Sequence, residues 1–340
     1  MLSLEVGLAA FMVIALTVYA LSGGADFGGG VWDLLALGPR ARAQRDLIST
    51  AVAPIWEANH VWLIAVIVVM FSAFPPAFAA MSTALHIPLT LVLLGIVMRG
   101  SAFVFRSQLP RDDVGYRQWS RVFAISSVVT PVMLGVSLGA VASGKLPLDA
   151  RGRVVTDFIS SWWAPFPFMV GLMILALFAY LAAVYLTLET DDAALQDDFR
   201  RRALGSAVAV GLLAWAALSL AHHGAPRLYE GLLRRWWSLP LQGLIALVAV
   251  GGMAALWLRR YRPARVLAMG QATLMVWGWA FAQYPYLVAP DLTVESSAAP
   301  RSVLVAVSVA LAVGTALLIP ALGYLYVVFK ARPGTKLTSS

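Results

Sequence analysis

Five ionisable side chains stand within long apolar stretches of this sequence, where a charge is costly. Asp26 lies in G-G-A-D-F-G-G-G, Glu57 and His60 lie in W-E-A-N-H-V-W-L, and the next apolar stretch contains His86 and Arg99. An ionisable group in lipid costs several kcal/mol unless it faces protein or water. These residues are therefore the first candidates for a functional site, and the acidic ones could relay protons through bound water.

Three of these charges are expected at a similar depth in a membrane. Arg99 precedes Arg106 by seven residues, which places it roughly 10 Å inside at the helical rise. Glu57 is about nine residues into a stretch that begins near Ile48, or roughly 13 Å inside by the same rise. Asp26 is expected at the inner end of the first span, where the glycines can let the helix give way. The three residues form either a buried ionic network that fixes helix register or a proton input from the cytoplasm.

Glu57 and His60 are three positions apart, so they share one face of a helix. That spacing permits a proton-transfer pair, and it equally permits a single orienting hydrogen bond. Haem ligation by His60 and His86 is disfavoured, because their expected vertical offset is roughly 7 Å at the helical rise. The chain has no cysteine, which excludes thiolate ligands and Fe–S clusters. It also lacks P-loop, dinucleotide-binding, H-E-x-x-H and serine-nucleophile motifs.

The elements that must position these residues are membrane-spanning helices. Of 340 residues, 60% are hydrophobic and 12% are charged, against roughly 25% charged in an average soluble domain. A helical crossing needs about 20 apolar residues, and the sequence contains about nine such stretches. They are expected at residues 4–24, 48–74, 78–105, 119–142, 162–188, 203–222, 239–258, 266–284 and 302–328. Because the apolar runs do not alternate with polar residues, they indicate an all-α bundle and not a barrel.

The distribution of basic residues predicts the orientation of the chain. One set of alternate connections contains 17 Lys and Arg residues, and the other contains 7. The positive-inside rule then places the N-terminus outside and the C-terminus in the cytoplasm. The net charge of +8 is thus explained by orientation in a bilayer, with no nucleic acid implied. The first stretch contains Glu5 and no basic residue precedes Arg40, so we interpret it as a membrane helix and not as a signal peptide.

Four segments, taken in order, resemble subunit II of the cytochrome bd family of quinol oxidases. They are G-A-D-F-G-G-G, A-P-I-W-E-A-N-H-V-W-L-I, L-V-L-L-G-I-V-M-R-G-S-A-F-V-F-R and Q-Y-P-Y-L-V-A-P. The resemblance covers essentially the whole chain, and the W-[D/E]-x-N-x-V-W part is the most specific. It implies one integral membrane domain over residues 1–340, built of two four-helix bundles and a peripheral helix. Helices 1–4 would occupy approximately 4–142, helices 5–8 approximately 162–284, and peripheral helix 9 approximately 302–328.

The resemblance also implies partners and cofactors. Subunit I of the family pairs with subunit II as a pseudo-symmetric heterodimer in the bacterial cytoplasmic (inner) membrane, in some cases with small single-span accessory subunits. Subunit I carries two b-type haems and one d-type haem, oxidises quinol and reduces dioxygen to water. The present chain is then expected to bind no haem and no metal, although some family members hold a structural quinone against subunit II.

Residue by residue, the resemblance implies roles for the buried polar groups. Glu57 matches the acidic position of the family motif and would conduct protons, with Asp26 and His60 on the same pathway. Asp26, Glu57 and Arg99 would form the buried ionic network. Trp62 matches a tryptophan near the proposed dioxygen entrance of the family.

Two other interpretations stay open at this point. In a secondary transporter, Asp26, Glu57 and Arg99 would form a substrate or ion site. Transporters place such a site near the midplane within an inverted repeat, whereas these charges lie toward one side and no repeat is evident. The second alternative is a purely structural assembly subunit with no part in proton or dioxygen access.

Overall fold

The computed structural model describes residues 3–52, 56–110, 112–146, 148–149, 154–155 and 157–330. At positions 56–57, 325–326 and 329–330 this description covers the backbone only. The described residues form twelve α-helices and one two-stranded sheet. The helices are α1 (Leu4–Leu34), α2 (Ala41–Val52), α3 (Trp56–Ala73), α4 (Pro75–Ala84), α5 (His86–Ser107), α6 (Val114–Ser143), α7 (Pro165–Leu186), α8 (Ala193–Gly224), α9 (Pro226–Leu233), α10 (Ser238–Trp257), α11 (Tyr261–Gln283) and α12 (Arg301–Lys330). Strands β1 (Tyr286–Val288) and β2 (Leu292–Thr293) pair in antiparallel fashion.

Local sequence signals set several helix boundaries. The Asp192 carboxylate accepts hydrogen bonds from the backbone N–H groups of Ala194 and Leu195 and so caps the start of α8. Asp113 caps α6 in the same way. Gly144 follows α6 with a φ of 72°, a left-handed conformation that glycine adopts without steric cost. The two aspartates thereby satisfy backbone N–H groups that have no partner within the helix.

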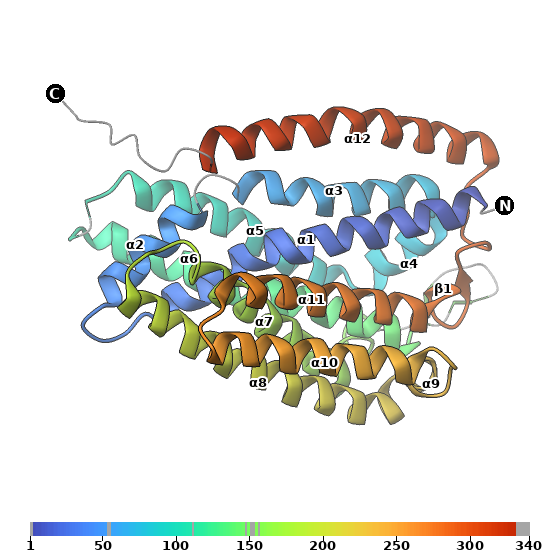
Figure 1. The fold of residues 1–340 in the computed structure, drawn as a ribbon. Coiled ribbons are helices and arrows are strands. Elements are labelled where there is room, and N and C mark those ends of the chain that lie inside the picture. Colours follow the sequence, from blue (N-terminus) through green and yellow to red (C-terminus); the bar gives the residue numbers. More distant parts are fainter. Residues whose placement is uncertain are drawn as a thin grey trace.

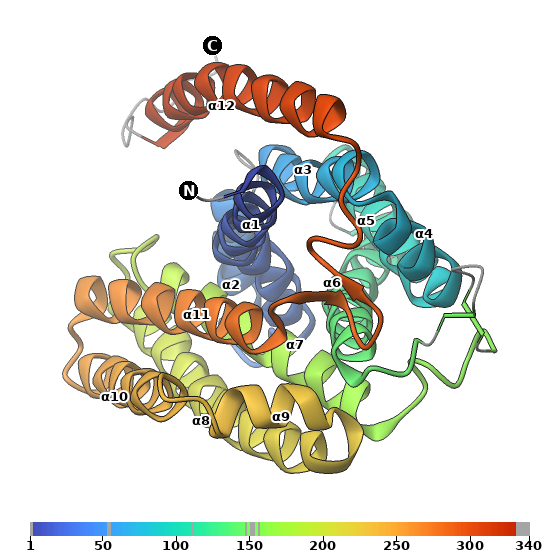
Figure 2. The same cartoon turned by 90° about the vertical axis from the view of Figure 1, so that its right-hand side faces the viewer.

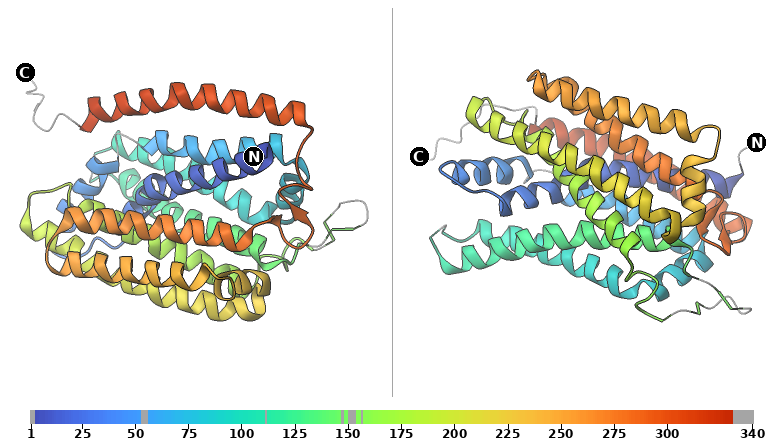
Figure 3. Two further views of the ribbon diagram at one scale, coloured as in Figure 1. Left: turned by 45° about the vertical axis from the view of Figure 1, so that its right-hand side comes forward. Right: turned by 90° about the horizontal axis from the view of Figure 1, so that it is seen from below.

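The long helices run side by side, with the N- and C-termini at opposite ends of the bundle (Figure 1). Helix α7 is central: 61% of its 18-residue apolar stretch is buried, against 6% of that of α12. Viewed along the bundle, α12 stands apart from the other helices (Figure 2). It lies on the side opposite α8 and α10, as the red and yellow-to-orange segments of Figure 3 show. The end of the bundle formed by α2 and the starts of α8 and α11 is called the basic end below, because arginines gather there.

The all-helical membrane architecture predicted from the sequence is confirmed. Among the described residues, seven helices are long and apolar enough to cross a membrane, or eight if α3 and α4 count as one bent span. Each of the nine expected stretches overlaps a long helix. The number nine, the orientation and the boundaries of the two bundles stay predictions.

The expected end of the first span at Gly24 is wrong. Helix α1 continues through the glycine-rich segment to Leu34, so Asp26 lies inside a helix and not at its end. The glycines allow close packing: a Cβ atom on Gly28 would overlap the carbonyl oxygen of Phe178 in α7. In this chain they bring backbones together, and they do not break the helix.

The second and third spans also differ from expectation. Ile48 lies in α2 and Glu57 in α3, which is described from Trp56 onward; residues 53–55 between them lie outside the described residues, so the expected depth of Glu57 stays a prediction. After α3 the chain bends by 117° into α4, whose first two residues are prolines. Proline favours helix starts because it lacks the N–H that a helix interior needs. His86 therefore begins α5 and is exposed, instead of lying within a span that starts near residue 78.

Candidate functional site

Arg99 of α5 is almost completely enclosed between α1 and α6, with 1% of its surface exposed. Its Nη2 donates a 2.8 Å hydrogen bond to the backbone carbonyl of Asp26 in α1, and its Nε donates to Ser127 Oγ of α6 at 3.1 Å. The rings of Phe27 and Phe123 lie 5.0 and 4.9 Å from the guanidinium carbon. A guanidinium at these distances interacts favourably with aromatic faces. Arg99 therefore links α5 to both α1 and α6.

Asp26 is also buried, at 5% exposure. Its carboxylate accepts a short hydrogen bond from the side-chain amide of Asn59 in α3. Asp26 and Arg99 also attract each other electrostatically. The structure thus brings together two of the three residues of the expected ionic network, and Arg99 bonds to the backbone of Asp26 while Asn59 bonds to its side chain.

The side chain of Glu57 lies outside the described part of the chain. The backbone places Glu57 in the first turn of α3, two positions before Asn59. Its place in the ionic network and on a proton pathway accordingly stays a prediction.

His60 lies among aromatic side chains of α1. Its ring centroid is 6.0 Å from those of Tyr19 and Phe27. The His60 Nδ1 and the Tyr19 hydroxyl are both buried without a hydrogen-bond partner in the described part of the structure. Buried polar groups of this kind commonly bond to internal water. Water at this position would extend the polar region of α3 beyond Asn59.

The two membrane histidines lie in different surroundings. The Nδ1 of His86 is 3.1 Å from the Thr83 carbonyl oxygen, and its ring packs on Phe158. His60 contacts Tyr19 and Phe27 instead. In the ranges that the structure describes, no group of three or more His, Cys, Asp or Glu side chains is placed to hold a metal ion.

A cavity of about 400 Å³ adjoins the Asp26–Asn59 pair. Its walls come from α1, α2, α3, α7, α11 and α12, and they are mostly apolar, with Trp62 among them. Glu189 and Arg265 line it as well; Glu189 follows the end of α7, and Arg265 lies near the start of α11. Since both of these positions are at the basic end, the cavity connects that end with the buried carboxylate of Asp26.

A second arginine repeats the arrangement of Arg99 closer to the basic end. Arg106 of α5 pairs with Asp33 of α1 at 3.2 Å, and both side chains are 5–6% exposed. Asp26 and Asp33 are seven residues apart, as are Arg99 and Arg106, and seven residues are about two helical turns. The parallel helices α1 and α5 are thus bridged at two levels in the same register.

At the basic end, charged side chains tie together segments distant in sequence. The Asp198 carboxylate accepts hydrogen bonds from Arg40 and from Gln44. The hydrogen bonds of Arg40 to Asp198, and the charge of that carboxylate, raise the pKa of the Arg40 guanidinium above its usual value. Asp197 pairs in the same region with Arg259. The connections between the helices are thereby held together outside the apolar part of the bundle.

Asn59, Ser127 and Asp33 were not among the site residues expected from the sequence. Asn59 and Ser127 are neutral, so a search for ionisable groups in apolar stretches passes over them. Asp33 lies beyond the expected end of the first span. The equal seven-residue spacing of the two aspartates and the two arginines is the sequence signal that could have identified Asp33.

Comparison with known proteins gives consistent matches. The family described as "Cytochrome bd terminal oxidase subunit II" matches residues 4–329. The chain is 33% identical over 202 residues to cytochrome bd ubiquinol oxidase subunit 2 of Bacillus subtilis (strain 168), which is 58% of this chain and 57% of that relative. It is 26% identical over 294 residues to the putative cytochrome bd menaquinol oxidase subunit II of the same organism, covering 82% of each.

Two further matches are to an Escherichia protein and to a solved structure. Cytochrome bd-I ubiquinol oxidase subunit 2 of Escherichia coli (strain K12) is 26% identical over 181 residues, 52% of this chain and 46% of that protein. The first of the Bacillus matches and the Escherichia match therefore span about half the length of those relatives. The structure of bd oxidase from Geobacillus thermodenitrificans superposes with a TM-score of 0.76 at 22% identity, covering 97% of this chain and 100% of that one. This last similarity establishes a shared fold.

Proposed function

Because the chain belongs to the cytochrome bd terminal oxidase subunit II family, whose pattern matches residues 4–329, we propose that it is the second subunit of a membrane-bound quinol:dioxygen oxidoreductase. Its partner is a subunit I that carries the haems, oxidises quinol and reduces dioxygen to water. The complex lies in the bacterial cytoplasmic membrane. The multi-pass helical fold and its similarity to a bd oxidase chain over 97% of the length support this assignment.

The contribution of this chain is to supply protons from the basic end, which is the cytoplasmic one. The cavity of about 400 Å³ between Asp26 and the basic end carries this proposal. A single water needs only about 10–15 Å³ of such space, so the cavity has room for a hydrated path. A buried carboxylate beside such a path can exchange protons with water.

In this proposal Glu57 takes protons near the start of α3, and Asp26 passes them on, with His60 farther along the same helix. The hydrogen bond from Arg99 to α1 is made to the backbone carbonyl of Asp26 and not to its carboxylate. Trp62 lines the same cavity and would border the dioxygen route on its lipid side. The alternative of a purely structural subunit assigns none of these residues a part in turnover.

The Glu57→Ala substitution separates these possibilities. Loss of the carboxylate should slow dioxygen consumption by the assembled complex about 100-fold, the lower end of what a positioned proton-transfer group contributes. The haem spectrum should be unchanged. Glu57→Asp should recover most of the rate, since it retains the carboxylate.

Asp112→Ala is the matched control, because Asp112 is an exposed acidic residue in the connection after α5. It should leave both the rate and the spectrum as they are. Full turnover by Glu57→Ala in a complex with all its haems would refute the relay.

We assign the haems to the partner, and the donor set of this chain supports that assignment. His60 packs beside Tyr19 and His86 beside Phe158, so the two histidines of the apolar stretches have separate surroundings. An optical spectrum of the chain purified without subunit I should lack haem bands. Haem bands from this chain alone would overturn the assignment of the cofactors without affecting the test of Glu57.

A further inference from the structure

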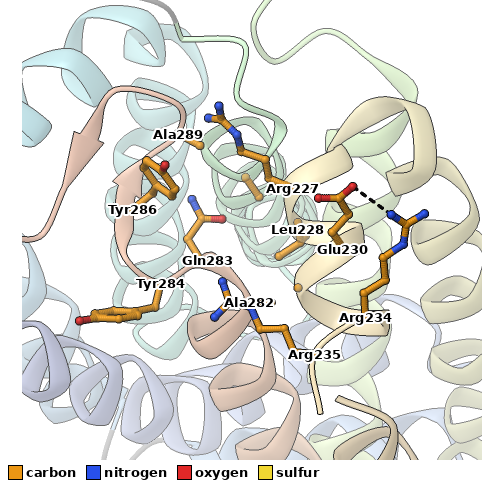
Figure 4. A pocket seen from close by; sticks show the side chains of 12 residues that line it. Arg227, Leu228, Glu230, Arg234, Arg235, Ala282, Gln283, Tyr284, Tyr286 and Ala289 are labelled. Carbon is orange, nitrogen blue, oxygen red and sulfur yellow. Dashed lines mark hydrogen bonds and ion pairs between the residues drawn. The ribbon is translucent and has the colours of Figure 1, made fainter. Parts of the chain in front are cut away.

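A second cavity lies at the end of the bundle opposite the basic end, far from the Asp26 site. It has a volume of about 300 Å³ and is bounded by α9, the end of α11 and the segment around β1 (Figure 4). Small residues form part of its wall, among them Gly231 and Ala282. A Cβ atom on Gly231 would be only 2.7 Å from the Ala282 carbonyl oxygen. The two helices thus approach closely here, and the pocket opens beside this contact.

Positive charge dominates the rim of this pocket. Arg227, Arg234 and Arg235 line it together with Glu230, for a net charge of +2. The Arg227 guanidinium lies 5.3 Å from the ring centre of Tyr286. Arg234 pairs with Glu230 at 3.4 Å in an exposed contact. An exposed pair of this kind contributes little to stability. Since Glu230 can offset only one of the three arginines, the uncompensated positive charge would attract an anion.

A buried hydrogen-bond donor lies at the centre of the same pocket. Gln283 is the last residue of α11 and is 8% exposed. Its Nε2 has no acceptor in the described part of the structure. Figure 4 shows the amide between Arg227, Tyr286 and Arg235. A buried donor without an acceptor costs free energy unless a water or a ligand satisfies it.

The chemistry of the pocket favours a phosphate group. Guanidinium groups match phosphate oxygens in charge and in the geometry of their N–H donors. The amide of Gln283 would add a neutral donor to a further oxygen. We propose that this pocket binds the phosphate group of an anionic ligand, which is either a phospholipid headgroup of the adjacent leaflet or free inorganic phosphate.

The surroundings of the pocket place it at the level of lipid headgroups. Trp236 follows Arg235 and is 89% exposed, and Tyr284 of the pocket wall is 51% exposed. Exposed Trp and Tyr side chains are enriched at the membrane interface. The segment Q-Y-P-Y-L-V-A-P supplies Gln283, Tyr284 and Tyr286 to the wall. This motif has no part in the proposed proton path, so the phosphate site does not rest on the oxidase assignment.

Native mass spectrometry of the whole complex tests the proposal. The complex is reconstituted in nanodiscs of phosphatidylcholine with a minor fraction of phosphatidylglycerol, released, and analysed for retained anionic lipid. Binding of radiolabelled inorganic phosphate to the delipidated complex is measured in parallel. The variants are Gln283→Met, which removes the amide at similar size, and the double variant Arg227→Gln with Arg235→Gln.

The wild-type complex should retain phosphatidylglycerol, and Gln283→Met should reduce this retention about tenfold, as expected for one lost hydrogen bond to a charged group. The double variant should abolish it. Arg301→Gln is the matched control: it removes an exposed arginine at the same end of the bundle, outside this pocket. It should behave as wild type.

Saturable binding of inorganic phosphate that both pocket variants lose, without lipid retention, would support the site and identify free phosphate as its ligand. Equal lipid retention and equal phosphate binding in wild type and pocket variants would overturn the proposal. The haem spectrum of each variant shows whether the complex is assembled. If the double variant fails to assemble, Gln283→Met still decides, because it removes no charge.

Discussion

At the scale of single residues, the acceptors of the Arg99 hydrogen bonds distinguish two functions, the anchoring of helices by Arg99 and proton exchange by the Asp26 carboxylate. The sequence alone does not distinguish them. The guanidinium bonds to the Asp26 backbone carbonyl and to Ser127 Oγ. The Asp26 carboxylate bonds to Asn59 and lines the cavity. A substitution of the Asp26 side chain can therefore alter protonation while the anchor of Arg99 remains.

Asp26→Asn tests this separation. The asparagine retains the backbone carbonyl and nearly the same volume but cannot ionise, so we expect dioxygen consumption to fall about 100-fold. The hydrogen bond of Arg99 to the backbone carbonyl is retained, but the midpoint of thermal unfolding should fall, because the charge that offsets the buried guanidinium is lost. Oxygen electrode and thermal unfolding measurements on one preparation check both points. A marked fall in thermal stability with normal turnover would instead identify Asp26 as a structural counter-ion for Arg99.

At the scale of elements, the sequence predicts where apolar helices lie better than it predicts how they pack. The stretch over 302–328 corresponds to α12 and the stretch over 239–258 to α10, within a few residues. The end of the first span is predicted wrongly because glycine can either interrupt a helix or allow two helices to pack closely. Gly28 and Gly30 face other helices, and a single sequence cannot show which backbone lies opposite.

The same limit applies to the site. Asp26 and Arg99 could be paired from charge and depth, because each needs compensation in an apolar bundle. The partners that complete the site, Asn59 and Ser127, are neutral, and one acceptor of Arg99 is a carbonyl group that every residue carries. Only the three-dimensional arrangement identifies which carbonyl it is.

Gly28→Ala tests the contact use of glycine. The added methyl would overlap the Phe178 carbonyl group of α7, and overpacking of this kind costs about 1–3 kcal/mol. Gly205→Ala in α8 is the control, because no atom lies within 4 Å of the position of its Cβ. That change should be neutral or stabilising, since alanine favours helix over glycine by roughly 0.5–1 kcal/mol. The free energy of unfolding in mixed micelles measures both, and equal effects of the two substitutions would contradict the contact role.

At the scale of the whole molecule, the bundle is polarised. Charged side chains of distant segments meet and pair at the basic end. The start of α1 and the end of α12 lie at opposite ends of the bundle, as Figure 1 shows. With the 17 to 7 division of basic residues, this polarity predicts a cytoplasmic C-terminus.

Reporter fusions check the orientation. Green fluorescent protein at the C-terminus should fluoresce, and alkaline phosphatase at the same position should be inactive, because each folds on only one side of the membrane. Fusions in the connection after α9 should give the reverse pattern. An active phosphatase at the C-terminus would invert the orientation and with it the side from which protons enter.

The two bridges between α1 and α5 also bear on how the chain assembles. Helices that enter the bilayer one after another can dock with one displaced along the other. A displacement by two turns, about 10.8 Å, would bring Arg106 level with Asp26 and leave both Asp33 and Arg99 without a charged partner. Each unmatched charge would then remain in an apolar environment, which is costly. The aligned docking forms both pairs and the displaced one forms only one, so the second bridge between α1 and α5 selects the observed register.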